Sequence, residues 1–392
     1  MRKSRVFRAS AFAIFLTLCL IPGIAHANDV AVNCPGQSLS DAVAALPPDG
    51  PNTVTVTGTC LNENVFITDM RSLTIKAGAS GAKIVQLQDN DTFDIFRSQR
   101  ITLQNLEIAG VPGSMPGSGG AGVFIGQTSN VQINGCHIYD NDGGGVTVTQ
   151  GSLLFLNNTT IHDNTPGGDG LDVLDNSTAR VTGSTIKYNG SACTVLLNCQ
   201  ANGEGVFVSS SVVFFLQNNL IQHNGDNGIG AVRGSTVVLG SPTLLGNNTI
   251  EGHNWNAIFL RSGSHLDDVN GSAVIQGNGT ACPADTALLV SLSQACGGIS
   301  AAENSTVDLR GGKITVNTGV GISVRQGTTL SLIGATVSDN SGDGVHIQWI
   351  SSGNFGPGNS ITGNGGASIF CDARSLAIGN LNGFSNVKCG EN

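Results

Sequence analysis

A single repeating unit runs through most of this 392-residue sequence and limits what the chain can fold into. Each unit has an aliphatic residue, two variable positions, Asn and a short turn. Gly, an aliphatic residue, a variable position and a second aliphatic residue follow. The Asn column contains Asn141, Asn164, Asn189, Asn224, Asn317, Asn340 and Asn364. Its members Asn141 and Asn164 lie 23 residues apart, and Asn340 and Asn364 lie 24 apart. Periods of this length are typical of solenoid proteins.

Two further columns keep the same period. The Gly column contains Gly122, Gly145, Gly170, Gly205, Gly228, Gly321 and Gly344, and a hydroxyl column contains Ser129, Ser152, Ser177, Ser235, Ser264, Ser305, Thr328 and Ser351. We interpret each unit as two short alternating strands joined by residues that tolerate positive φ. Coils stacked about 4.8 Å apart would pair every strand in parallel with its copies and bury the aliphatic residues. The sequence therefore predicts an all-β fold, a single-stranded right-handed parallel β-helix.

The expected domain covers residues 28–392, with a cover at each end because open coils expose strand edges. Residues 38–48, SLSDAVAALPP, combine an N-cap signal with apolar residues at helical spacing and end in two prolines, so we predict a capping helix there. Residues 371–392 are expected to form the C-terminal cap.

The first 27 residues have the features of a cleaved signal peptide. Four basic residues precede an apolar run, and AHA at positions 25–27 offers a small-x-small cleavage pattern. We therefore expect a secreted or periplasmic protein without a transmembrane segment, since no later run is apolar for 18 residues. After cleavage, 14 basic residues remain against 27 acidic ones, so the charge of −13 argues against a nucleic-acid partner. We expect a monomer.

Nine cysteines remain after the leader, and an export route permits disulfide bonds. Closeness in sequence pairs Cys34 with Cys60, Cys193 with Cys199, Cys282 with Cys296, and Cys371 with Cys389. The second and third pairs would close loops at about 193–199 and 282–296. Cys136 is left over and is expected to be a buried thiol.

The segments SLSDAVAAL, NTVTVTGTCLNENVFI, RITLQNLEIAG and NNLIQHNGDNGIGAV resemble secreted bacterial members of the pectin-lyase-like superfamily, across nearly the whole mature chain. The resemblance implies the fold but not one chemistry, because that superfamily includes lyases, glycosidases, epimerases and adhesins. GGDGLDV is similar to the N-T-D-G-hydrophobic-D segment of polygalacturonases, which would put Asp169 on a catalytic position. The paired aspartates, G-H-G and R-I-K of those enzymes are missing, as are R-x-P-x-x-R of pectate lyases and D-P-H of mannuronan epimerases.

Three carboxylates form the candidate catalytic cluster. Asp169 precedes a column Gly, Glu204 holds the same place one coil later, and Asp172 lies at an outward strand position. Backbones about 4.8 Å apart suit the carboxyl separation of a retaining glycosidase. The sequence identifies no cofactor, although calcium is an ion that three such oxygens would suit. The alternative interpretation is ordinary turn chemistry, since Asp343 also precedes a column Gly.

A second candidate patch lies along outward strand positions. Phe207 and Phe259 flank Gly230 and could stack on sugar faces, while Arg233 and Arg261 could pair with uronate carboxylates. The alternative is that an insertion loop covers the rings.

The sequence leaves three functions open. The first is a lyase or hydrolase of uronate-containing extracellular polysaccharide, the second a non-catalytic carbohydrate-binding or surface-interaction protein, and the third a structural solenoid. Whether the protein is an enzyme is not decided by the residues alone.

Overall fold

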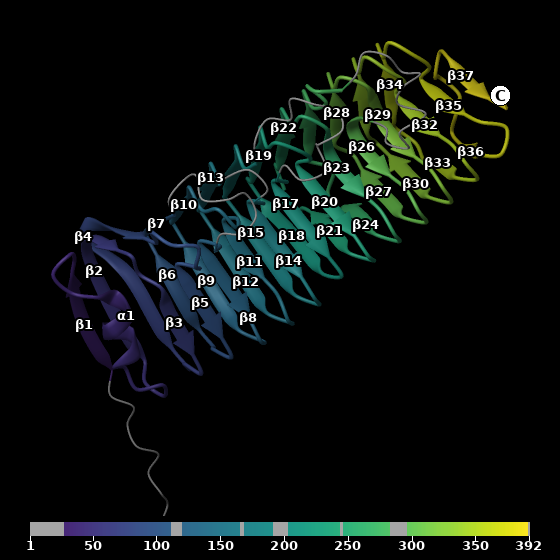
Figure 1. Ribbon diagram of the computed structural model, residues 1–392. Helices are drawn as coiled ribbons and strands as arrows, with labels where there is room; N and C mark the ends of the chain where they lie inside the picture. The colour runs from purple at the N-terminus through teal and green to yellow at the C-terminus, as the bar shows by residue number, and fades with distance from the viewer. Residues whose placement is uncertain are drawn as a thin grey trace, which may run out of the picture.

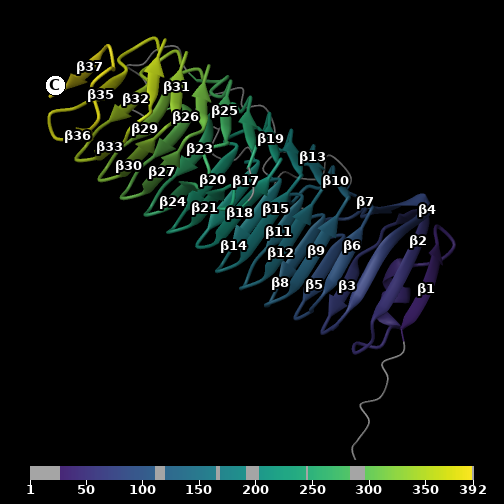
Figure 2. The same ribbon diagram turned by 180° about the vertical axis from the view of Figure 1, so that it is seen from behind.

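The computed structural model describes residues 27–110, 120–164, 168–190, 203–243, 246–282 and 296–390. In these ranges the chain forms one elongated solenoid that runs from β1 at one end to β37 at the other (Figures 1 and 2). All of its neighbouring strands pair in parallel, from β1 with β2 to β35 with β37. The predicted parallel β-helix is confirmed.

Three short strands make up each coil. The first series forms a 13-stranded sheet: β3 (Val65–Thr68), β5 (Phe93–Phe96), β8 (Val123–Gly126), β11 (Val146–Val148), β14 (Leu171–Leu174), β17 (Val206–Ser209), β20 (Ile229–Val232), β23 (Asn256–Leu260), β26 (Gly297–Ala301), β29 (Val320–Val324), β32 (Val345–Ile347), β35 (Ile369–Cys371) and β37 (Val387–Cys389).

The second series is β1 (Asn28–Asn33), β2 (Asn52–Leu61), β4 (Leu73–Val85), β6 (Ile101–Gln104), β9 (Asn130–Asn134), β12 (Leu153–Asn157), β15 (Thr178–Thr182), β18 (Val212–Gln217), β21 (Thr236–Leu239), β24 (His265–Asp268), β27 (Thr306–Arg310), β30 (Thr329–Ile333), β33 (Ser352–Phe355) and β36 (Leu376–Gly379).

The third series is β7 (Glu107–Ala109), β10 (His137–Tyr139), β13 (Thr160–His162), β16 (Thr185–Lys187), β19 (Leu220–Gln222), β22 (Thr249–Glu251), β25 (Val274–Gln276), β28 (Lys313–Thr315), β31 (Thr336–Ser338) and β34 (Ser360–Thr362). The second and third series count as one 24-stranded sheet because β2 and β4 run through both.

The expectation of two strands per unit was therefore wrong. A residue with positive φ bends the chain between the second and third strands, as Asn158 does at φ 48 between β12 and β13. In sequence the two strands are so close that LLFLNNTTIH resembles one alternating strand.

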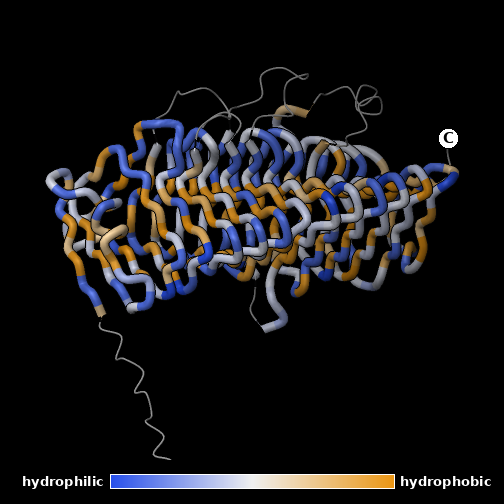
Figure 3. The backbone as a smooth tube through the Cα atoms, turned by 60° about the horizontal axis from the view of Figure 1, so that its bottom comes forward, coloured by the Kyte–Doolittle hydropathy of each residue, from blue (hydrophilic) through white to orange (hydrophobic). Residues whose placement is uncertain are grey.

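Inward side chains of all three series form one continuous core. Val146, Leu171 and Val206 align on neighbouring strands of the 13-stranded sheet and are almost completely buried. Hydrophobic residues recur at matching places of successive coils along the solenoid (Figure 3). Each coil alone is too thin to bury these residues, so its stability depends on both neighbours.

The Asn column forms a buried ladder. The amide of Asn164 donates to Asn189 at 2.7 Å, and the amide of Asn189 donates to Asn224 at 3.0 Å. His253 replaces Asn in the next coil, where its Nδ1 accepts the N–H of Asn224. Burial lowers the pKa of His253 to about 3, so the ring is neutral and fits an uncharged ladder.

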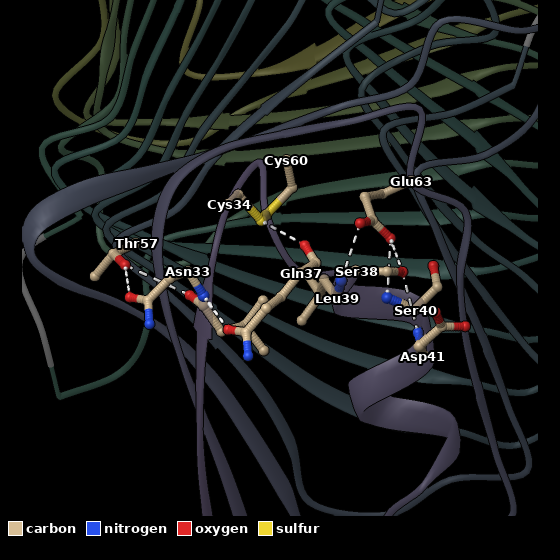
Figure 4. The surroundings of a disulfide bond; sticks show 11 residues. Asn33, Cys34, Gln37, Ser38, Leu39, Ser40, Asp41, Thr57, Cys60 and Glu63 are labelled. Carbon is tan, nitrogen blue, oxygen red and sulfur yellow. Dashed lines mark hydrogen bonds between the residues drawn. A yellow bond between two sulfur atoms is a disulfide. The ribbon is translucent and has the colours of Figure 1, made fainter.

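The N-terminal end is covered as predicted, by a shorter helix. Helix α1 (Leu39–Ala44) starts after Ser38, whose side chain accepts from the N–H of Asp41, and it ends before the two prolines. The carboxylate of Glu63 accepts the N–H groups of Leu39 and Ser40, each at 2.9 Å (Figure 4). These bonds satisfy donors that a helix start leaves free.

Three of the expected disulfide bonds are present: Cys34–Cys60 beside the capping helix (Figure 4), Cys282–Cys296, and Cys371–Cys389 near the other end. The Cys193–Cys199 pair and nearly all of the expected signal peptide lie outside the described residues. Cys136 is a buried free thiol, and burial raises its pKa to about 11. Within the described ranges, no helix has the length and apolarity needed to cross a membrane.

Candidate functional site

Asp169 and Asp172 form a hydrogen-bonded carboxyl pair where the chain enters β14, near the middle of the solenoid (Figure 1). Asp169 also accepts the backbone N–H of Glu204 from the next coil, and Asp172 accepts the hydroxyl of Thr147 at 3.3 Å from the previous one. Burial raises the pKa of both carboxyls, and the charge of Asp169 raises that of Asp172 further. Such a pair holds a proton to a higher pH than an isolated carboxyl does.

The position of Asp169 is a recurring clamp between coils. Asp91 accepts the backbone N–H of Ala121, and Asp343 accepts that of Ala367 at 2.6 Å. In each case the clamp aspartate also bonds to the side chain three residues on, which is Asp94 for the first and His346 for the second. Asp169 therefore occupies a position that other coils also use to bond to the next coil, and any chemistry comes from the groups around the clamp.

Glu204 adds a third carboxyl beside the Asp169–Asp172 pair. Its side chain leans onto the next coil and lies over Gly230, where an added methyl group would collide with both carboxyl oxygens. Asn227 donates to Oε1 at 3.1 Å, whereas Oε2 is buried with no hydrogen-bond partner in the described part of the chain. Burial raises the pKa of Glu204 well above its usual range, and the charges of Asp169 and Asp226 add to that shift.

The two phenylalanines of the second predicted patch lie beside the Glu204 carboxyl. Phe207, Gly230 and Phe259 occupy directly paired outward positions on β17, β20 and β23. Both rings are half-buried, and the Glu204 carboxyl fills the gap that Gly230 leaves between them. The arrangement places an acid between two apolar ring surfaces of the kind that stack on sugars.

Asp226 is a member of the cluster that the sequence analysis missed. Burial raises its pKa to about 7, and the charge of Asp169 contributes. Asp226 lies in the turn segment NGDNG, where an aspartate is ordinary. Its one distinguishing signal was its place one coil after Glu204, directly before the aligned residue Asn227.

The two predicted arginines do not join this cluster through any hydrogen bond or ion pair in the described ranges. Arg261 is paired with Glu303 at 2.6 Å, and Arg233 is exposed in a turn at φ 56. Nor do the described residues contain a group of three or more His, Cys, Asp or Glu side chains that could hold a metal ion. The charges that shift the pKa values of Asp172, Glu204 and Asp226 are those of neighbouring carboxyls in the cluster.

Comparison with known proteins is informative about the fold. Residues 67–241 match the family described as a right handed beta helix region. No curated protein sequence matches the chain significantly.

Among solved structures, the A-module of the Azotobacter vinelandii mannuronan C-5 epimerase AlgE4 is similar over 90% of this chain and 93% of its own, with 12% identity and a TM-score of 0.55. The periplasmic alginate epimerase AlgG is similar over 93% of this chain and 84% of its own, with 14% identity and a TM-score of 0.55. The Dettilon tailspike protein is similar over 82% of this chain and 62% of its own, with 14% identity and a TM-score of 0.51. At such identities the likeness concerns the fold.

Proposed function

Since the chain is a right-handed parallel β-helix with the fold of the pectin-lyase-like superfamily, we propose that it is an exported enzyme that hydrolyses glycosidic bonds of an extracellular polysaccharide. The observation that carries the proposal is the Glu204 carboxyl, which is held over Gly230 between two phenylalanine rings and next to the Asp169–Asp172 pair. The names of the similar epimerases, which refer to mannuronan and alginate, support a polysaccharide as the substrate.

The roles of the carboxyls follow from their surroundings. Glu204, whose pKa is raised well above its usual range, holds its proton to a higher pH than a free glutamate and can donate it to the leaving glycosidic oxygen. The Asp169–Asp172 pair, once it has lost one proton, can serve as base or nucleophile on the other side of the bond. Phe207 and Phe259 would hold the flanking sugar rings by stacking.

Hydrolysis of a neutral glycan fits this site better than elimination from a polyuronate. The cluster contains four carboxyls with raised pKa values, of Asp169, Asp172, Glu204 and Asp226, and each uronate would add a negative charge. The arginine expected to neutralise such a charge, Arg261, is already paired with Glu303. We therefore place neutral polysaccharides ahead of the uronate-containing ones that the sequence suggested.

Binding without catalysis is a second candidate function, and the recurring clamp favours it. If Asp169 only joins coils, as Asp91 does, the protein would hold a glycan on Phe207 and Phe259 without cleaving it.

The test is release of new reducing ends from purified protein incubated with glucomannan, xylan, hydroxyethylcellulose, alginate and polygalacturonate, together with absorbance of unsaturated products. Glu204→Gln and Asp169→Asn should each lower the rate by about 10² to 10⁴, the usual contribution of a general acid or base. Asp91→Asn is the matched control, because it alters the same clamp in another coil. Equal losses in the Asp91 and Asp169 variants, or no turnover of any substrate by the unaltered protein, would refute catalysis at this cluster.

A further inference from the structure

Tyr188 and His223 occupy a corner of the solenoid where large residues are unusual. Both lie directly after strands of the third series, with φ of 54° and 52°. The same corner in other coils holds Asp140, Asp163, Gly252, Gly277, Val316, Asp339 and Gly363, none of which is aromatic. A residue with a side chain costs roughly 1 to 2 kcal/mol in this left-handed region. Two aromatic side chains are therefore held facing outward at a conformational cost.

The two rings form a stack that remains accessible. Their centroids are 5.4 Å apart and their planes are inclined by only 8°. Tyr188 is 44% exposed, and the amino group of Lys187 lies 5.4 Å from its ring centroid. The imidazole of His223 extends over Gly252 of the next coil, where a methyl group would collide with it.

A groove of about 470 Å³ begins at this stack. Among the residues that the structure describes, its lining is Tyr188, Gly190, His223, Gly225, Gly252, Asn254 and Thr280. Gly190 and Gly225 contribute no side chain to the floor, and the His223 imidazole covers the floor at Gly252. The amide of Asn254 donates to the Gly225 carbonyl at 3.0 Å, and the Thr280 hydroxyl donates to Asn254 at 2.9 Å, so the polar wall is fixed. Flat rings beside a bare floor and a fixed polar wall suit a pyranose ring, which has apolar faces and a hydroxylated rim.

We propose that Tyr188 and His223, with the groove beside them, form a second carbohydrate-binding site that holds a sugar unit of a neutral glycan by stacking. The groove lies next to the carboxyl cluster, because its floor residue Gly225 directly precedes Asp226. A glycan that crosses this turn can occupy the groove with one part and reach the carboxyls with another. The inference shares with the proposed function only the premise that the ligand is a glycan.

The chain contains a matched control for this site. Tyr139 and His162 stack in almost the same way, with centroids 5.1 Å apart and planes inclined by 8°. Tyr139 differs because its hydroxyl bonds to Glu107, and neither ring belongs to the groove. A loss of binding specific to Tyr188 therefore reports on the groove and not on stacked rings in general.

The experiment is affinity electrophoresis of the full mature chain in gels that contain glucomannan, xylan, hydroxyethylcellulose or polygalacturonate. A Glu204→Gln background prevents cleavage of the probe and leaves the groove residues untouched. Tyr188→Ala and His223→Ala should weaken retention by at least one neutral glycan by about tenfold, which is about 1.4 kcal/mol. Tyr139→Ala should migrate like the parent.

Three results would overturn the inference: unchanged retention in both groove variants, an equal loss in Tyr139→Ala, or no retention of the parent by any neutral glycan. Retention of the parent by polygalacturonate alone would also overturn the inference, because polygalacturonate is not a neutral glycan. If the unaltered protein cleaves nothing but its retention depends on Tyr188, the proposed hydrolysis fails and the binding site stands. If cleavage depends on Glu204 while retention does not depend on Tyr188, the opposite holds.

Discussion

The raised pKa values of the carboxyl cluster predict that the protein becomes less stable as the pH rises, and Asp226→Asn isolates one contribution. The pKa of Asp226 moves from 3.8 to about 7 on folding. The folded state therefore binds the proton more tightly than the unfolded state. Stability from this proton is fully present below pH 3.8 and is lost as the pH rises through 7.

The magnitude follows from the shift. Three pKa units correspond to about 4 kcal/mol at about 1.36 kcal/mol per unit. The carboxyl of Asp226 is partly exposed, so solvent screening reduces the expected effect to about 1 to 2 kcal/mol. Asn cannot ionise, so Asp226→Asn should stabilise the protein by that amount at pH 8. At pH 4.5 the gain should fall to about a quarter, because the folded state still holds its proton there and pH 4.5 lies only slightly above the unfolded pKa of 3.8.

Urea unfolding followed by circular dichroism at pH 4.5 and pH 8 measures the two differences. Asp89→Asn, at an exposed position outside the cluster, is the control and should change little at either pH. A variant that is destabilised equally at both pH values would show that Asp226 is held by hydrogen bonds that matter more than its charge, and the reasoning would be wrong.

Further substitutions test other features of the structure. Gly230→Ala should displace the Glu204 carboxyl and lower turnover at least about 10²-fold with an unchanged circular dichroism spectrum, whereas Gly36→Ala, with room for a methyl group, should be silent in the same assay. Asn189→Ala should lower the free energy of unfolding in urea by about 2 to 3 kcal/mol, since it leaves buried ladder groups unpaired; a loss under 0.5 kcal/mol would contradict this. Val173→Asp should abolish cooperative unfolding, because the side chain is fully buried; a cooperative transition would refute the core assignment.

The regular part of the fold could be predicted from the sequence because it repeats. The Asn column specified the ladder, and His253 could be recognised as a substitute from its place in the period. The bend at Asn158 was missed, since only backbone conformation separates β12 from β13. Repetition also explains why Asp169 and Glu204 could be placed on neighbouring coils, as their contact shows.

The rest of the site depends on the direction in which each outward side chain extends, and the repeat period does not determine that direction. An outward residue can extend along its strand or onto the next coil. Glu204 extends onto the next coil and fills the gap at Gly230 that the sequence analysis had left open for sugar. For the same reason, the salt bridge of Arg261 with Glu303 could not be foreseen.

The coil clamp at Asp91, Asp169 and Asp343 has a consequence for how such a protein can acquire new chemistry. The bond that each of these aspartates makes to the next coil is enough for evolution to retain it. An oriented carboxyl is therefore present at these three points before selection acts on any catalytic activity. What differs is the side chain three residues on, which is Asp94, Asp172 or His346. A single substitution at that outward position places a second carboxyl or an imidazole beside the clamp aspartate. The two side chains can then act together as an acid or a base, and the core remains unchanged.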